Sequence, residues 1–228
     1  MMLTDLLPPG LLPLRNAPDL VAGVLREAIA SGRLLAGQPL RQVQLAAELG
    51  VSRIPLREAL RQLEAEGLVR HNPNRGVVVA TLSWREVEEI GEMRVALETR
   101  ALGHAAQIAD AAAIAEAADC LDEADGCGNA GRLGELNHRF HAILYRAAGR
   151  PLLLDAIARL HANVNRYMRL VLGDLGHQRA SQREHRALLE AVRDGDGDRG
   201  ALVLERHITA ATGLLVRHLK NAERRDIP

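Results

Sequence analysis

The segment from Gly50 to Val69 reads GVSRIPLREALRQLEAEGLV and predicts a short amphipathic helix. Its apolar side chains recur at the spacing of a buried helical stripe, at Leu56, Ala59, Leu60 and Leu63. Arginines recur every four residues on a neighbouring face, at Arg53, Arg57 and Arg61. Ser52 precedes the first turn and can cap it with its hydroxyl. Such a face suits a polyanionic groove, and the alternative is a solvated basic surface.

The segments on either side of this helix favour the interpretation that it binds a polyanionic groove. Leu40–Leu49 predicts a short preceding helix that Gly50 ends, and two helices joined by a tight turn form a helix-turn-helix. Residues 68–71 and 77–79 read as two strands around a turn at residues 72–76. A hairpin beside a helix-turn-helix is a wing, and it brings Arg75 within reach of a phosphate or a minor groove. We therefore predict a winged helix-turn-helix.

These motifs are familiar together. Residues 18–81 resemble the DNA-binding domain of the GntR family of bacterial transcription regulators, through GVSRIPLREAL, EGLV and NRG. The resemblance implies that Ser52, Arg53 and Arg57 contact DNA and that the wing contributes Arg75 and Gly76. Some members carry an arginine where this chain has Val43, so that contact is absent or moved to Arg41.

Composition indicates a helical protein without a membrane span. The chain is 47% hydrophobic but only 2% aromatic, so its core must consist of aliphatic side chains. The 29 basic and 29 acidic residues balance, which argues against a polyanion-coating protein. No apolar run reaches the roughly 20 residues that a membrane helix needs. Residues 1–17 lack a basic segment and contain several prolines, so we expect a flexible arm and a cytoplasmic protein.

Residues 84–222 predict a second, all-helical domain. Thr81–Ser83 forms the connection, and Ser83 can cap the helix that follows. Short polar or glycine breaks separate apolar-striped segments, which is typical of an antiparallel bundle. The six expected helices are 84–107, 111–125, 131–148, 151–172, 178–194 and 198–222. The predicted fold class is therefore mainly α, with an N-terminal winged helix-turn-helix and a C-terminal antiparallel bundle.

Three histidines fall on buried stripes of three different predicted helices, at His141, His185 and His207. Asn137 precedes His141 by four residues on the same helix edge, whereas His138 is expected to point outward. Buried polar groups need partners, and one divalent cation could serve all four. Imidazole nitrogen with amide oxygen suits Zn²⁺, Ni²⁺ or Mn²⁺. Periodicity leaves inert core histidines as an equal alternative.

A second resemblance bears on this choice. Residues 84–218 are similar to the all-helical effector domain (FCD) of the FadR subfamily of GntR regulators, through EMRVALETRAL, NHRFHAILYRAAGRPLL, SQREHRALLEAV and ERHI. Metal-binding members use an Asp, a His four residues later and two further His. The resemblance implies a metal site at Asn137, His141, His185 and His207, with Asn137 in place of the Asp.

Arg94 is the other polar residue expected inside the bundle. It can form an ion pair with Glu98 on the next turn, or it can bind the carboxylate of an effector. The resemblance implies that this arginine lines the effector cavity. A small organic acid, held by the metal and by Arg94, is the expected ligand.

These features together predict a ligand-responsive transcription regulator. We expect a homodimer on a palindromic operator of double-stranded DNA, with no membrane partner. One alternative is a metal sensor in which the ion itself is the signal. A metalloenzyme is a weaker alternative, because the chain contains no HExxH motif and no clear general base beside the histidines.

Overall fold

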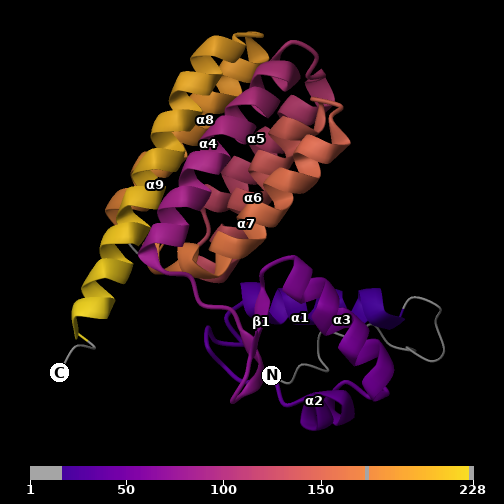
Figure 1. Ribbon diagram of the computed structural model, residues 1–228. Coiled ribbons are helices and arrows are strands. Elements are labelled where there is room, and N and C mark those ends of the chain that lie inside the picture. The colour runs from indigo at the N-terminus through magenta and orange to yellow at the C-terminus, as the bar shows by residue number, and fades with distance from the viewer. Residues whose placement is uncertain (1–16, 173–174, 226–228) are drawn as a thin grey trace. The chain divides into compact units, whose positions relative to one another are not determined.

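The computed structural model describes residues 17–172 and 175–225 (Figure 1). The chain divides into two compact units, residues 1–81 and 82–228. Residues 1–16 of the expected arm lie outside the described residues. A three-helix unit with a two-stranded sheet and an all-helical unit confirm the predicted mainly α fold class.

The first unit is built around the packing of α1 (Ala17–Ala30) on α3 (Arg53–Ala65). Along the chain, α2 (Gln42–Glu48) comes between these two helices. Gly50 follows α2 with a φ of 64°, a conformation that favours glycine. The core of the unit consists of buried aliphatic side chains of α1 and α3, namely Val21, Leu25, Ile29, Leu56, Leu60 and Leu63. All of the predicted apolar positions of the arginine-bearing helix are therefore buried.

The wing follows α3 directly. Its strands β1 (Val69–Asn72) and β2 (Gly76–Val79) pair antiparallel, from Val69 opposite Val79 to Asn72 opposite Gly76. The backbone N–H of Leu40 donates to the carbonyl of Val77 at 2.8 Å, which ties the hairpin to the segment before α2. The predicted hairpin is confirmed.

The second unit is an antiparallel bundle with α4 at its centre. Its helices are α4 (Trp84–Ala106), α5 (Ala111–Asp125), α6 (Ala130–Arg146), α7 (Pro151–Leu172), α8 (Leu175–Arg193) and α9 (Gly197–Arg225). The prediction placed the start of α8 three residues too late, because Gly176 continues the helix instead of breaking it. Residues 173–174 of the expected break lie outside the described residues.

Several local features position α4 in this bundle. Ser83 and Glu86 form a reciprocal capping box at its start, as the sequence predicted for Ser83. At Gly91 a Cβ atom would lie only 2.6 Å from Cγ2 of Thr212, so α4 and α9 approach closely because this residue has no side chain. Helix α4 also contacts α6, α7 and α8, so its inward residues reach the middle of the bundle. None of the helices in the described ranges is both long and apolar enough to cross a membrane.

Candidate nucleic-acid interface and metal centre

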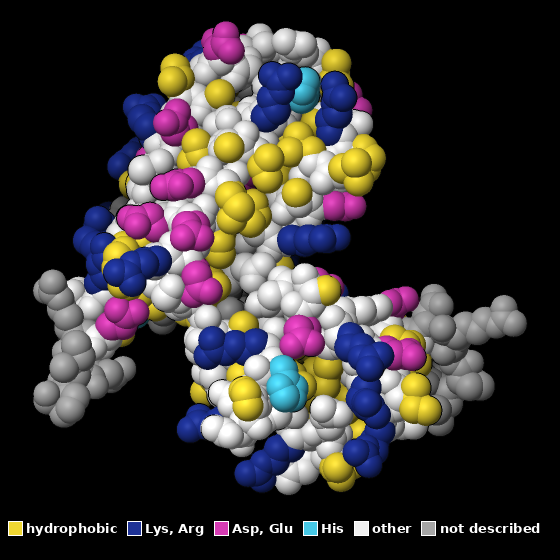
Figure 2. All heavy atoms as spheres, viewed as in Figure 1, with side chains coloured by type: hydrophobic (Ala, Val, Ile, Leu, Met, Phe, Trp, Pro, Cys, Tyr) yellow, Lys and Arg dark blue, Asp and Glu magenta, His cyan; other side chains and the backbone are white. Residues whose placement is uncertain are grey.

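The exposed face of α3 carries the predicted arginines. Arg53, Arg57 and Arg61 are all exposed, whereas the neighbouring apolar face of the helix is buried, and α3 packs against α1. Figure 2 shows Lys and Arg side chains gathered in a stripe over this helix. Two large apolar side chains are also exposed on the helix-turn-helix, Val43 of α2 at 67% and Ile54 of α3 at 70%. The face therefore offers both guanidinium groups and apolar contacts to a partner.

The other predicted DNA contacts are Ser52 at the start of α3 and Arg75 and Gly76 in the wing. Ser52 is the N-cap residue of α3, but its hydroxyl makes no capping hydrogen bond, so the expected cap is wrong in that respect. The Ser52 side chain is exposed instead. In the wing, the exposed Arg75 lies in the turn between the strands, and Gly76 has a φ of 70° that permits that turn.

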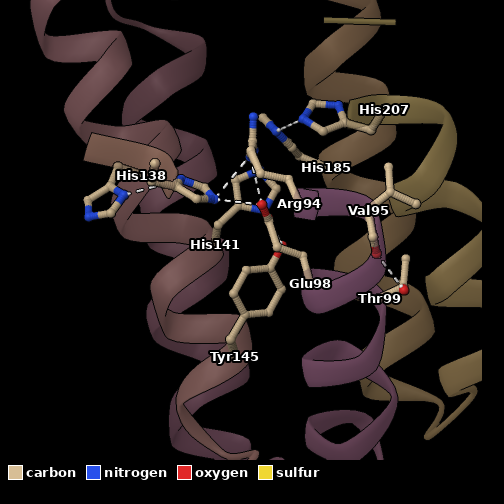
Figure 3. A network of polar contacts seen from close by, with 10 residues as sticks. Arg94, Val95, Glu98, Thr99, His138, His141, Tyr145, His185 and His207 are labelled. Atoms are coloured by element: carbon tan, nitrogen blue, oxygen red, sulfur yellow. Dashed lines mark hydrogen bonds and ion pairs between the residues drawn. The ribbon is translucent and has the colours of Figure 1, made fainter. Parts of the chain in front are cut away.

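In the second unit, His141 of α6, His185 of α8 and His207 of α9 converge in the core. One ring nitrogen from each lies within 4.8 Å of the others. The side chains are nearly inaccessible, with exposed fractions of 1% for His141, 3% for His185 and 5% for His207. Three histidines from three helices therefore meet at one point, and Figure 3 shows them beside one another.

Each of these rings has a hydrogen-bond acceptor on its Nδ1 side. Nδ1 of His141 lies 3.0 Å from the Tyr145 hydroxyl. Nδ1 of His185 lies 3.0 Å from Oε1 of Gln182, and Nδ1 of His207 lies 2.9 Å from Oε2 of Glu184. A carboxylate and an amide oxygen can only accept, so we assign a proton to Nδ1 of His185 and of His207. The Tyr145 hydroxyl donates its own proton to Glu98, so Nδ1 of His141 also carries a proton. The Nε2 lone pairs are then directed into the cluster.

The Nε2 atoms form the inner surface of the cluster. Those of His185 and His207 are 3.3 Å apart. Nε2 of His141 is buried and has no hydrogen-bond partner among the described residues. Burial and the neighbouring His185 and His207 hold the pKa of His141 well below its usual range, so this ring stays neutral. Imidazoles from three helices with converging Nε2 atoms have the chemistry of a transition-metal site.

Asn137, the fourth predicted ligand, lies one turn before His141 on α6. It lines a small cavity together with His185, Ser181 and Gln178. The cavity has a volume of about 20 Å³, which is room for about one water molecule. Asn137 and His185 thus line a common small cavity, whose other walls are mainly apolar.

Arg94 lies deep in the bundle beside Glu98 (Figure 3), and it also contacts His161. Its Nε donates to Oε1 of Glu98 at 2.7 Å, and its Nη2 lies 3.3 Å from Nε2 of His161. The carboxylate of Glu98 is fully buried and also accepts from the Tyr145 hydroxyl at 2.8 Å. Nε2 of His161 lies 2.9 Å from Oε1 of Glu98. The ion pair with Glu98, one of the two interpretations of Arg94, is therefore present.

Burial and charge determine how these groups titrate. Burial by itself raises the pKa of Glu98, but Arg94 and His161 outweigh it and hold the pKa well below its usual range. Burial, and then the charge of Glu98, raises the pKa of Tyr145 well above its usual value. Burial and Arg94 lower the pKa of His161. The network thus holds one carboxylate anion, one guanidinium cation and a neutral phenol.

Four residues of this network were not recognised from the sequence as parts of a site: Tyr145, His161, Gln182 and Glu184. Tyr145 follows His141 by four residues on α6, a spacing that could have indicated their contact. The prediction that His138 points outward is wrong. Its ring is partly buried with Nδ1 3.5 Å from Nδ1 of His161, and burial and His161 lower its pKa to about 4.

The architecture is that of a DNA-binding regulator with a separate helical domain, and comparison with known proteins gives the same answer. Residues 19–79 match the model of bacterial regulatory proteins of the gntR family, and residues 89–210 match the model of the FCD domain. The chain therefore belongs to the GntR family of bacterial transcription regulators, in the group that carries an FCD domain. This confirms the family inferred from the sequence.

The similar proteins are transcription regulators, and the similarity extends over most of their length. The Nta operon transcriptional regulator of Aminobacter aminovorans is 32% identical over 75% of this chain and 81% of its own. The uncharacterised HTH-type regulator YdhC of Bacillus subtilis strain 168 is 28% identical over 86% of this chain and 88% of its own. The structure of E. coli McbR/YncC shares the fold, with a TM-score of 0.80 and 22% identity. The match covers 90% of this chain and 99% of that structure. The prediction of a regulator and not an enzyme is confirmed.

Proposed function

We propose that this protein is a homodimeric regulator whose operator affinity responds to a small carboxylate bound beside a metal ion in the FCD domain. The convergence of three buried imidazoles, each with a hydrogen bond at Nδ1 and its Nε2 directed inward, carries the proposal. Residues 18–81 would bind DNA, and residues 84–222 would bind the effector and dimerise. Because its partner is the chromosome, we expect it to work in the cytoplasm.

For DNA binding, we assign the base contacts to α3. Ser52 at its N-cap and Arg53 and Arg57 in its first two turns are exposed, and an α-helix fits the major groove. Arg75 and Gly76 of the wing would contact the backbone or the minor groove. A twofold dimer would place two such helices on the half-sites of a palindromic operator.

For the metal, we assign His141, His185 and His207 as ligands and Asn137 as a weaker oxygen ligand. Three imidazoles with an amide oxygen suit Zn²⁺, Ni²⁺ or Mn²⁺. Once bound, such an ion would supply positive charge and an open position for a carboxylate oxygen. The small cavity beside Asn137 and His185 is consistent with an additional oxygen ligand there.

For the effector, we assign Arg94 as the second contact of the carboxylate. Its Nε donates to Glu98 and its Nη2 lies beside His161, whereas Nη1 makes no hydrogen bond with any described residue. An entering acid could therefore bind Nη1 without first breaking the ion pair. A hydrogen bond from a charged guanidinium to a carboxylate is stronger than one between neutral groups.

A direct connection joins this region to the start of the second unit. The backbone N–H of Leu82 donates to the Tyr167 hydroxyl at 2.8 Å, and Tyr167 belongs to the same helix, α7, as His161. Leu82 is the first residue after the DNA-binding unit. A displacement of α7 on effector binding would therefore reach the connecting segment, provided that the acid binds two arrangements of the bundle with different affinity.

The proposal can be tested by operator binding. Duplexes selected by the wild type from a random pool serve as the probe, with Mn²⁺, Ni²⁺ or Zn²⁺ present and with a panel of mono-, di- and hydroxycarboxylates. We expect at least one acid to change the affinity about 5-fold or more, in the usual range of allosteric coupling. The response should be lost in Arg94→Lys and retained in Arg100→Lys, which changes an exposed arginine of the same helix.

Two results would decide against this scheme. An affinity unchanged by every acid would contradict the carboxylate effector. A change with the metal salt alone, and no further change with any acid, would favour a metal sensor, for which the histidine cluster suffices without Arg94.

A further inference from the structure

The histidine cluster is backed by a layer of hydrogen-bond acceptors that the metal-ligand motif does not include. His141 contacts Tyr145, and behind Tyr145 lies Glu98, as Figure 3 shows. His207 contacts Glu184 directly. Two carboxylates therefore lie one or two hydrogen bonds away from two of the three imidazoles.

We propose that Tyr145 is a positioning residue of the metal centre, and that Glu98 and Glu184 supply through hydrogen bonds the negative charge that Asn137 does not. This inference rests on the metal site of the proposed function and goes beyond it. The ligand motif identifies which side chains would bind the ion. The layer behind them determines how the rings are oriented and how basic their Nε2 atoms are.

The position of the protons carries the argument for Tyr145. Its hydroxyl has one proton, which it donates to Oε2 of Glu98 at 2.8 Å. The oxygen can then only accept from Nδ1–H of His141, 3.0 Å away. This contact determines the tautomer of His141 and directs its unpartnered Nε2 into the cluster.

Glu98 is itself held in place from two further directions. Nε of Arg94 lies 2.7 Å from its Oε1 and Nε2 of His161 lies 2.9 Å from the same atom. With the Tyr145 hydroxyl, donors from α4, α6 and α7 converge on one buried carboxylate. Because every contact is buried, the orientation of the Tyr145 hydroxyl is rigidly determined and so is that of the His141 ring.

The charges explain why this layer would matter in this chain. Three neutral imidazoles and the neutral amide of Asn137 leave both charges of a divalent ion uncompensated among the ligands. The carboxylate of Glu184, 2.9 Å from Nδ1 of His207, provides negative charge behind one ring. Glu98 provides it behind Tyr145 and His141, although Arg94 offsets part of that charge. A carboxylate behind a ligating histidine raises the basicity of the ring.

The chain provides a matched test because it contains two tyrosines. Tyr145→Phe removes the hydroxyl behind His141, whereas Tyr167→Phe removes a hydroxyl that contacts the backbone of Leu82. The affinity of each full-length protein for Zn²⁺ would be measured by competition with a chromophoric chelator. The visible absorption of the Co²⁺ form would report the ligand geometry.

We expect Tyr145→Phe to bind Zn²⁺ about 10- to 100-fold more weakly than the wild type, as is usual when a partner behind a metal ligand is lost. Its Co²⁺ spectrum should change, because the His141 ring is no longer held. Tyr167→Phe should match the wild type in both measurements. Equal affinity and an unchanged spectrum in Tyr145→Phe, with only a lower thermal stability, would make Tyr145 a structural residue and overturn the inference.

A second pair of variants tests the charge even if Tyr145→Phe does not fold. Glu184 is partly exposed, so Glu184→Gln should fold while keeping an acceptor for His207 without its charge. We expect its Zn²⁺ affinity to fall by about 10-fold, and that of Glu190→Gln, at an exposed site of the same helix, to stay unchanged. Equal affinities would contradict charge compensation. If the wild type itself binds no metal, the metal site of the proposed function fails instead.

Discussion

Replacing Arg53 and Arg57 together by Ala is expected to weaken operator binding by about 100-fold or more, since each arginine that contacts a base contributes roughly 1–3 kcal/mol. Both side chains are exposed and lie outside the packed stripe of α3, so the fold should be unaffected. Fluorescence anisotropy with a selected operator duplex would measure the loss, and the salt dependence of binding should become less steep as well.

The matched control removes the same charge elsewhere. Arg150 and Arg193 are exposed residues of the second unit, and replacing both by Ala should leave operator affinity within a few-fold of the wild type. If both double variants lose affinity equally, only the overall charge matters for binding. In that case the assignment of α3 as the recognition helix would be wrong.

Replacing Glu98 by Ala should be the most destabilising single change in the second unit. The carboxylate is fully buried, and its loss leaves the Arg94 guanidinium without its counterion in a closed core. Removing one partner of a buried pair costs about 3–5 kcal/mol. Urea unfolding of the metal-free protein, followed by far-ultraviolet circular dichroism, should show a clearly lower midpoint.

The control for this change is on the same helix. Glu92 is exposed on α4, and Glu92→Ala should leave the midpoint almost unchanged. A Glu98→Ala protein as stable as Glu92→Ala would mean that Arg94 readily finds water or another partner. The network around Glu98 would then not hold the core of the bundle together.

The DNA-binding unit was predictable from sequence because its signals are local. The apolar spacing of Leu56 to Leu63 defines a helix face, and Gly50 marks the turn that ends the helix before it. The exception is Ser52, whose hydroxyl could as well be exposed as cap the helix. Sequence spacing cannot distinguish these two rotamers.

The bundle was less predictable in its polar interior than in its helices. The inward direction of His141, His185 and His207 follows from their periodicity, and they meet as that periodicity suggested. The contacts of His161 with Glu98 and of His138 with His161 depend instead on how α7 packs on α4 and α6. Contacts between residues more than 20 positions apart leave no mark in the periodicity of either helix.

The metal site makes the account most directly testable. Elemental analysis would compare the purified wild-type protein with a His141→Ala, His185→Ala double variant. We predict about one transition-metal ion per protomer in the wild type and none in the variant, because the remaining imidazole and amide cannot hold the ion alone. A wild type that contains no metal and takes up none from added Zn²⁺, Ni²⁺ or Mn²⁺ would contradict the proposal and reduce the three histidines to core residues.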